Sequence, residues 1–319
     1  MRLAVAAACV SLSGFWATAI AQTYPSKPIR LIVPYAPGGG TDIIARIVGQ
    51  KLGETWGRPV VIDNRAGAGS TVGTALVVKS PADGYTWVMS SISLAFDTTI
   101  YKDLPYDPVR DLAPVGLVAT QPNILAVHPS LAVKSVSELL AQAKARPGAI
   151  NYASAGSGSG PHLATELLKM LSGIDITHVA YKGTGPALND LLGGQVQMMI
   201  AVMASTLPHV ASGKLRGLAV TGAARSPGAP DIPTVAESGV PNYEFNTWYG
   251  IQVPAGTPRA VVTQINAGVL RALQDPDVRA RFAAGGLEPL GSTPDEFGAM
   301  VRAEIAKWKK VAAAIGAAK

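Results

Sequence analysis

The fold is decided by a stretch near the N-terminus, residues 29–56, which reads IRLIVPYAPGGGTDIIARIVGQKLGETW. It begins with an apolar run, Ile29–Val33, that is typical of a buried strand. A loop rich in glycine and proline follows, and from Thr41 to Trp56 the apolar residues recur at helical spacing along one face. The stretch therefore predicts a strand, a glycine-rich loop and an amphipathic helix, which together form the repeating unit of an α/β fold.

The same unit recurs in the second half of the chain, where residues 150–171 read INYASAGSGSGPHLATELLKML. Short β-rich runs and helical patterns alternate on both sides of it. The runs expected to be strands are 29–33, 60–62, 85–90, 115–119, 124–128, 150–154, 176–181, 196–202, 215–221 and 247–253. Strands that alternate with helices predict parallel sheets with helices on both faces.

Two series of this kind predict two α/β lobes. The chain is expected to cross between them near Gln121-Pro122 and again near residues 246–250. The first lobe then comprises residues 22–121 and 247–319, and the second comprises residues 122–246. Two extended connections form a hinge, so the cleft between the lobes is the expected ligand site.

The composition narrows the class of protein. The 319 residues carry 27 Lys and Arg against 21 Asp and Glu, a net charge of +6, and 48% of them are apolar. This composition excludes a disordered chain, which needs low hydrophobicity and high charge. The single cysteine excludes an intramolecular disulfide scaffold. The charge surplus is small and its densest run is Lys307, Lys309 and Lys310, so no nucleic-acid partner is expected.

The first 21 residues have the pattern of a secretory signal peptide. Arg2 supplies a positive start, residues 3–20 carry no charge, and Ala19-Ile20-Ala21 fits a cleavage site. We expect cleavage after residue 21 and export of the mature chain. The cleaved segment contains Cys9, so the mature chain would have no cysteine. An uncleaved membrane anchor is the alternative, because the uncharged run approaches the length that spans a bilayer.

Signatures of catalysis and of metal or cofactor binding are weak. His162 and Glu166 stand at i, i+4 on one expected helix, but such a pair is more often a surface pair or a helix cap than a metal site. Ser157 or Ser159 with His162 as base leaves an exported hydrolase as an alternative, although no third partner is visible. Residues 67–73 resemble a dinucleotide turn, but the next strand lacks the acid that would hold the ribose. We therefore expect no cofactor and no metal.

Two loops have the features of an anion site. Residues 34–42 and 154–162 each follow a strand and precede a helix. Glycines let backbone amides approach a ligand, and a helix N-terminus adds unpaired N–H groups and partial positive charge, which suit a carboxylate. Neither loop contains Lys or Arg. The alternative is that both are plain turns with helix caps, from Thr41 or Asp42 in one and Ser159 in the other. If Asp42 faces the cleft instead, it favours a ligand that also carries an ammonium group.

Besides these loops, the chain contains a distinctive combination of short motifs: YPSKPIRLIVPY (24–35), PGGGTD (37–42), VIDNRAGAG (61–69), PADGYT (81–86), YASAG (152–156), HLA (162–164), YKG (181–183) and PAGTP (254–258). In this combination the chain resembles the periplasmic solute-binding receptors of tripartite tricarboxylate transporters, also called the Bug family. The similarity extends over nearly the whole chain after residue 21. The family often has a bulkier residue before His162, so Gly160-Pro161 is expected to alter the shape of the site.

The resemblance implies a two-lobed periplasmic binding protein of type II, the Venus flytrap, in which each lobe is a sheet flanked by helices. Such a receptor captures a small carboxylate and presents it to permease subunits in the membrane. The ligand-binding residues expected from the family's two loops and from their neighbours are Tyr35, Pro37, Gly39, Gly40, Thr41, Asp42, Ser90, Ser154, Ala155, Gly156, Gly158, Ser159, His162, Tyr181 and Met203. Ligands in the family include di- and tricarboxylates, acidic amino acids and aromatic acids, so the resemblance does not identify the acid. A sensory binding protein that feeds no transporter is a further alternative.

Overall fold

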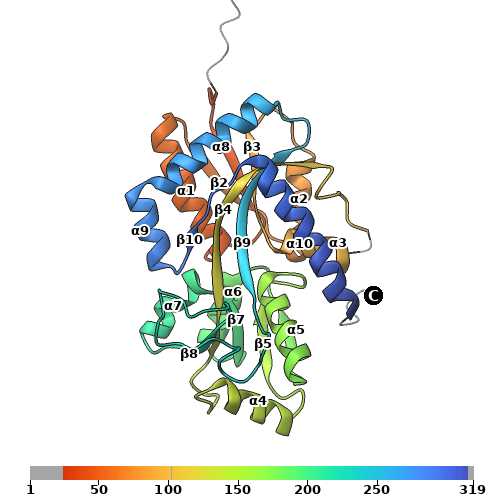
Figure 1. The fold of residues 1–319 in the computed structure, drawn as a ribbon, viewed down its shortest axis with the longest axis vertical. Coiled ribbons are helices and arrows are strands. Elements are labelled where there is room, and N and C mark those ends of the chain that lie inside the picture. Colours follow the sequence, from red (N-terminus) through yellow and green to blue (C-terminus); the bar gives the residue numbers. More distant parts are fainter. Residues whose placement is uncertain (1–23, 102, 315–319) are drawn as a thin grey trace, which may run out of the picture.

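A computed structural model describes residues 24–101 and 103–314, so the expected signal peptide lies outside the described residues. Two lobes are joined by two long strands (Figure 1). The first lobe contains the N-terminal elements and also the last part of the chain, and the second lobe contains the middle part. Within the described ranges, no helix has the length and apolar character that crossing a membrane requires.

The first lobe is a sheet covered by helices. Its N-terminal elements are β1 (Ile29–Val33), α1 (Gly40–Trp56), β2 (Val60–Asn64), the 3-10 turn η1 (Ala68–Ser70), α2 (Thr71–Val78), β3 (Thr86–Ser91) and α3 (Ser93–Ile100). The C-terminal part of the chain adds α8 (Arg259–Gln274), α9 (Pro276–Ala284), β10 (Glu288–Pro289) and α10 (Pro294–Ala314). Strand β1 pairs in parallel with β2 and with β3, as the alternation of strands and helices predicts. Helix α3 is an element that the sequence pattern did not indicate.

The second lobe repeats this plan on a smaller scale. Its elements are α4 (Val136–Ala145), β5 (Asn151–Ser154), α5 (Gly160–Ser172), β6 (Thr177–Ala180), α6 (Thr184–Leu192), β7 (Met198–Val202), α7 (Met203–Ala211) and β8 (Arg216–Val220). Strand β5 pairs in parallel with β6 and β7. Residues 225–241 are rich in proline, glycine and serine, which predicts a loop, and they form turns and a single β-bridge.

Two antiparallel strands, β4 (Leu112–Val127) and β9 (Asn246–Pro254), run from one lobe into the other (Figure 1). The prediction of two separate strands, 115–119 and 124–128, is therefore wrong. Pro122 lies opposite Asn246, where β9 begins, and the pairing of β4 with β7 starts at Asn123. The missing N–H of Pro122 thus falls where the partner strand changes, and its cost is small. The sheet, of order β2-β1-β3-β9-β4-β7-β5-β6, is mixed rather than purely parallel as predicted.

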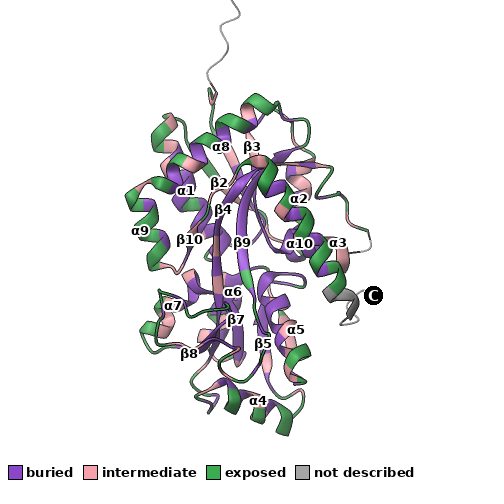
Figure 2. Cartoon of the chain, viewed as in Figure 1, coloured by how far each residue is buried: buried purple, intermediate pink, exposed green. Residues whose placement is uncertain are grey.

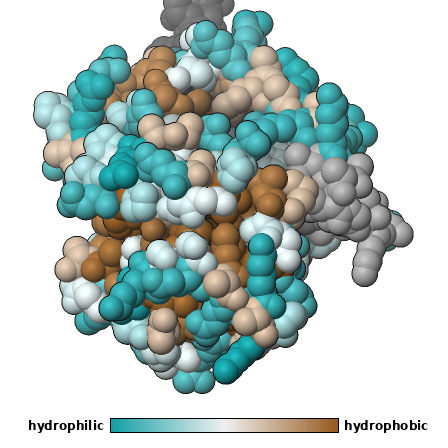
Figure 3. All heavy atoms as spheres, turned by 60° about the horizontal axis from the view of Figure 1, so that its bottom comes forward, coloured by the Kyte–Doolittle hydropathy of each residue, from teal (hydrophilic) through white to brown (hydrophobic). Residues whose placement is uncertain are grey.

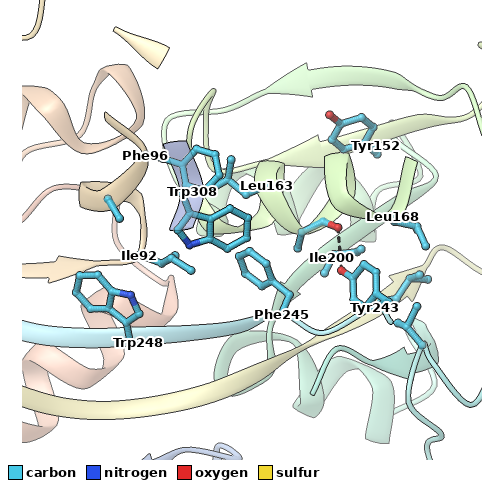
Figure 4. Close-up of a cluster of buried hydrophobic side chains, with 14 of the residues drawn as sticks. Ile92, Phe96, Tyr152, Leu163, Leu168, Ile200, Tyr243, Phe245, Trp248 and Trp308 are labelled. Carbon is cyan, nitrogen blue, oxygen red and sulfur yellow. Dashed lines mark hydrogen bonds between the residues drawn. The ribbon is translucent and has the colours of Figure 1, made fainter. Parts of the chain in front are cut away.

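Buried apolar residues fill each lobe and continue across the region where the lobes meet. The crossing strands β4 and β9 are buried along most of their length (Figure 2). Beside them, Trp308 of α10 lies between Phe96 of α3 and Phe245, with ring centroids 4.5 and 5.7 Å away (Figure 4). The sequence of the last helix places Phe297, Val301, Ile305, Trp308 and Ile315 at helical spacing, which predicts one apolar stripe. The first four are buried, which confirms the stripe for its described part, and Ile315 lies outside the described residues.

Candidate ligand-binding site

The two lobes meet over a small cavity of about 30 Å³, called here the central cavity. Its lining residues come from both lobes and from β9, and they are Tyr35, Gly39, Gly40, Thr41, Ser91, Ser93, Ala155, Ser159, Gly160, Pro161, Thr184, Val202, Thr247 and Tyr249. On the surface, hydrophobic residues gather in the hollow between the lobes (Figure 3). A space of about 30 Å³ holds about one water molecule. The lobes therefore leave little room between them at this point.

Five helices begin at the central cavity. The residues at or next to their first turns that line it are Gly39 and Gly40 of α1, Ser93 of α3, Ser159 and Gly160 of α5, Thr184 of α6 and Val202 of α7. The first turn of a helix leaves N–H groups without intrahelical partners and carries a partial positive charge. In the described chain, no Lys, Arg, His, Asp or Glu lines this cavity. It thus offers backbone dipoles and hydroxyls to an anion.

Glycines on both sides of the cavity let the lobes come together. A Cβ on Gly40, the first residue of α1, would lie 2.8 Å from Val202 Cγ2 and 2.7 Å from the Tyr249 hydroxyl. A Cβ on Gly185, in α6, would overlap the carbonyl oxygen of Pro37. Each position requires glycine because atoms of the facing segment already occupy the space that a side chain would need.

Hydroxyl groups supply the polar part of the wall. The Tyr35 O–H donates to Ser93 Oγ at 2.6 Å, and burial raises the pKa of Tyr35 to about 12, so this tyrosine remains neutral. The Tyr249 hydroxyl accepts a hydrogen bond from Nε2 of Gln121 at 2.7 Å. Ser159 occupies the N-cap position of α5, but its buried Oγ makes no cap bond and has no other partner among the described residues. Because a buried hydroxyl without a partner is costly, Ser159 has a hydrogen bond to offer a ligand.

Known proteins share this architecture. The family model described as tripartite tricarboxylate transporter family receptor, TctC, matches residues 44–317. The chain belongs to this receptor family. It is 41% identical over 317 residues to protein BugT of Bordetella pertussis, a match that covers 99% of this chain and 97% of BugT.

Solved structures of similar proteins agree with this membership. The structure of a protein of R. palustris with adipate has a TM-score of 0.89 to this TctC receptor, and the two sequences are 39% identical. The match covers 92% of this chain and 98% of the R. palustris chain. MatC from Rhodopseudomonas palustris with bound malate has a TM-score of 0.87 and 32% identity, with coverage of 90% and 99%. Members of the family are periplasmic solute-binding proteins, and the predicted two-lobed type II fold is confirmed.

The predicted ligand-binding residues of the TctC receptor fall into three groups. Those that line the central cavity are Tyr35, Gly39, Gly40, Thr41, Ala155 and Ser159. Gly156 and Tyr181 line a second cavity of about 190 Å³, called here the side cavity, which shares Tyr35 and Ala155 with the first. The residues that line neither cavity are Pro37, Asp42, Ser90, Ser154, Gly158, His162 and Met203. Among these, Ser90 donates its hydroxyl to the Gly250 carbonyl, and Met203 packs beside Gly286.

Asp42 does not cap α1, and it lines neither cavity. The N-cap residue of α1 is Gly39, and Asp42 is buried away from both cavities. Its carboxylate accepts from the Gly38 N–H and from Asn64 Nδ2, both at 3.0 Å, and pairs with Arg46 at 2.9 Å. Burial alone would raise the pKa of Asp42, but the bonds from Arg46, Gly38 and Asn64 outweigh burial and lower it. Asp42 therefore links the first glycine loop, at Gly38, to the end of β2, at Asn64.

Ser154 and His162 support the second glycine loop in a similar way. Ser154 Oγ accepts the Gly156 N–H at 3.1 Å, and His162 Nδ1 accepts the Gly158 N–H at 3.2 Å. The His162 ring stacks on His178, whose Nε2 lies 2.6 Å from Ser154 Oγ. Burial lowers the pKa of both histidines, that of His178 to about 4. Both rings are therefore neutral near neutral pH, as an accepting Nδ1 requires.

The structure does not assemble the catalytic or metal alternatives. Ser159 Oγ bonds to no described residue, and His162 Nδ1 is already bonded to a backbone N–H. Within residues 24–101 and 103–314, no group of three or more His, Cys, Asp or Glu side chains is arranged to hold a metal ion.

The central cavity also contains hydroxyl residues that the sequence reasoning missed, namely Ser91, Ser93, Thr184, Thr247 and Tyr249. Ser91 ends β3, and Thr184 begins the helix after β6. Both therefore lie at or shortly after the C-terminal end of a strand, as the two glycine loops do, and this signal could have identified them. Thr247 and Tyr249 lie on β9 and reach the cavity only because this strand crosses between the lobes, which no local pattern indicates.

Proposed function

We propose that this TctC receptor captures a small carboxylate in the central cavity and delivers it to the membrane permease subunits of a tripartite tricarboxylate transporter. One arrangement carries the proposal: five helix N-termini and the unpartnered Ser159 hydroxyl converge on a cavity that no charged side chain of the described chain lines. Every helix end there presents the same sign of partial charge. The arrangement therefore suits an anion and opposes a cation.

Dicarboxylates are the ligand class that we favour. Two relatives of solved structure carry adipate or malate. The central cavity and the side cavity adjoin at Tyr35 and Ala155, so a ligand with one carboxylate in the central cavity can extend toward the side cavity. Lys182 lines the side cavity and brings a positive charge that suits a second carboxylate.

The proposed mechanism is closure of two lobes about β4 and β9. We retain residues 22–121 with 247–319 as the first lobe and residues 122–246 as the second. A space of about 30 Å³ is too small for a dicarboxylate, so the lobes must move apart to admit one. The signal pattern of residues 1–21 supports export to the periplasm, where a receptor meets its permease.

Titration calorimetry of the mature protein with adipate, malate, citrate, glutamate and benzoate tests the binding step. At least one acid is expected to bind with roughly micromolar affinity, the strength that three or four hydrogen bonds to a carboxylate support after the entropy of association. The melting temperature should rise with that acid and not with a diamine of similar length. Failure of every acid to bind overturns the proposal.

Two further measurements separate the alternatives. Mass spectrometry of the incubated acids detects turnover, and a product would support the exported hydrolase instead. Uptake of the bound acid by cells that express the permease, with and without the receptor, tests delivery. Binding without receptor-dependent uptake would support the sensory alternative.

A further inference from the structure

A carboxyl group is buried behind the proposed anion site. Asp97 lies on α3, the helix whose first residue, Ser93, lines the central cavity. The Asp97 side chain is fully buried. Ser70 Oγ and the Tyr106 O–H both donate to its Oδ2 at 2.8 Å. Its Oδ1 is also buried and has no hydrogen-bond partner in the described chain.

Asp97 lies about one helical turn along α3 from the central cavity. Ser93, the first residue of α3, lines the cavity, and Asp97 follows it at i, i+4 on the same helix. Tyr35 lines the cavity and donates there to Ser93, and burial together with the nearby Asp97 carboxylate raises the pKa of this tyrosine. The buried carboxyl group therefore lies close behind the space proposed for the ligand.

No described cation balances Asp97. The titratable groups that face it are three tyrosines: Tyr106 from the segment after α3, Tyr35 from the loop after β1, and Tyr101 at the end of α3. Within the described ranges, α10, β3 and η1 pack against α3 without bringing a charged side chain to Asp97. Burial raises the pKa of Asp97 to about 7, although the bonds from Tyr106 and Ser70 act in the opposite direction. Asp97 is therefore poised to change its protonation state near neutral pH.

We infer that Asp97 is a positioning residue for the anion site and that it takes up one proton from the solvent when a carboxylate enters the central cavity. This inference rests on the proposed function. A ligand carboxylate brings a second negative charge into a region shielded from water, where two nearby carboxylates do not both stay ionised. The helix N-termini stabilise the charge of the ligand, so the proton goes to Asp97. Protonation of the unpartnered Oδ1 then removes a buried charge that nothing neutralises.

The receptor then binds its ligand together with a proton, and the affinity depends on pH. Below about pH 6 Asp97 is already protonated in the free protein, so the dissociation constant is constant. Above about pH 7 the proton must come from the solvent, and the dissociation constant rises by up to about tenfold per pH unit. This dependence differs from that of an anion site made only of backbone amides, which have no proton to exchange.

Titration calorimetry from pH 6 to pH 9 tests the inference. The probe is adipate, or whichever of malate, glutamate and benzoate binds more tightly at pH 6; citrate is left out because it titrates in this range. Wild-type protein is expected to show the rise in dissociation constant above about pH 7 and a binding heat that varies with the ionisation enthalpy of the buffer. Asp97→Asn is expected to show neither. Asp277→Asn, the same change on exposed α9, is the control and should keep the wild-type profile.

Tyr106→Phe provides a second variant should Asp97→Asn fail to fold. It removes a donor to the ionised carboxylate and so moves the onset of the pH dependence to higher pH. Three results would overturn the inference and leave the receptor function intact. The first is a dissociation constant of wild-type protein that does not change with pH. The second is an Asp97→Asn variant that keeps the wild-type dependence on pH, and the third is a Tyr106→Phe variant in which the rise begins at the same pH as in wild type. If no acid binds wild-type protein at pH 6, the proposed function fails, and this inference fails with it.

Discussion

The backbone N–H of Ala36 donates to the carbonyl oxygen of Lys182 at 3.0 Å, which joins the first glycine loop directly to the second lobe. Glycines surround this bond. A Cβ on Gly183 would lie 2.8 Å from the Ala36 nitrogen, and one on Gly185 would overlap the Pro37 carbonyl oxygen. At this edge of the central cavity the lobes therefore touch through backbone. Because opening must break these contacts, they influence the balance between closed and open forms.

Gly185→Ala is expected to weaken ligand binding by about tenfold or more, because its methyl group would keep the lobes apart and make the closed form a minor state. The free protein should lose little stability, since alanine favours a helix more than glycine does. Gly53→Ala, in α1, is the matched control because its nearest new contact is an ordinary 3.5 Å. Calorimetry and thermal melts compare the two variants. Equal affinities would contradict the role given to this contact.

Ser159→Ala is expected to weaken carboxylate binding by about 10- to 100-fold, because it removes one hydrogen bond to a charged group. Thr206→Val is a matched control: Thr206 also has a buried hydroxyl without a partner, but it does not line the central cavity. Neither change removes a hydrogen bond of the described protein, so both variants should melt at or slightly above the wild-type temperature. Similar affinities for the two variants would argue against Ser159 as a ligand contact.

The local patterns of the sequence were sufficient to predict the two units that each consist of a strand, a loop and a helix. Apolar periodicity and clustered glycines define 29–56 and 150–171, and neither depends on distant residues. The role of Asp42 could not be predicted because its partner Asn64 reaches it through the pairing of β1 with β2. The break expected at Pro122 was wrong for a similar reason: the cost of a proline in a strand depends on which strand lies beside it.

The candidate site shows the same division. The loop residues of each lobe could be proposed from sequence because glycine loops after strands are recognisable locally. Tyr249 could not, because it reaches the cavity along a strand that crosses between lobes. Asp97 could not either, since its significance lies in being buried beside Ser70 and Tyr106 rather than in its neighbours along the chain.

Asp42→Ala is expected to destabilise the protein at neutral pH by about 1–3 kcal/mol, because it removes charge-assisted hydrogen bonds to Arg46, Gly38 and Asn64. The pKa of Asp42 is lowered in the folded protein, so its stabilising contribution is present above the unfolded value of about 4 and is lost as the pH falls further. Urea denaturation at pH 7 and at pH 3 measures the difference. The gap between wild type and variant should shrink at the lower pH, whereas the exposed Asp231→Ala should show no such gap. A gap that persists at pH 3 would mean that packing, not charge, stabilises the loop.

Trp308→Ala is expected to weaken both the fold and ligand binding, because Trp308 packs across the two lobes. Its ring lies against Phe96 of α3 and against Phe245, whose N–H donates to the Thr221 carbonyl just after β8 (Figure 4). Truncation of a buried tryptophan costs about 3–5 kcal/mol. Trp87→Ala is the matched control, because Trp87 is equally buried but packs against Trp56 within the first lobe. Denaturation should show that Trp308→Ala and Trp87→Ala lose comparable stability. Calorimetry should show weaker ligand binding only for Trp308→Ala, because only there does the closed form lose a contact that spans both lobes. Equal losses of affinity in both variants would mean that Trp308 acts through overall stability alone.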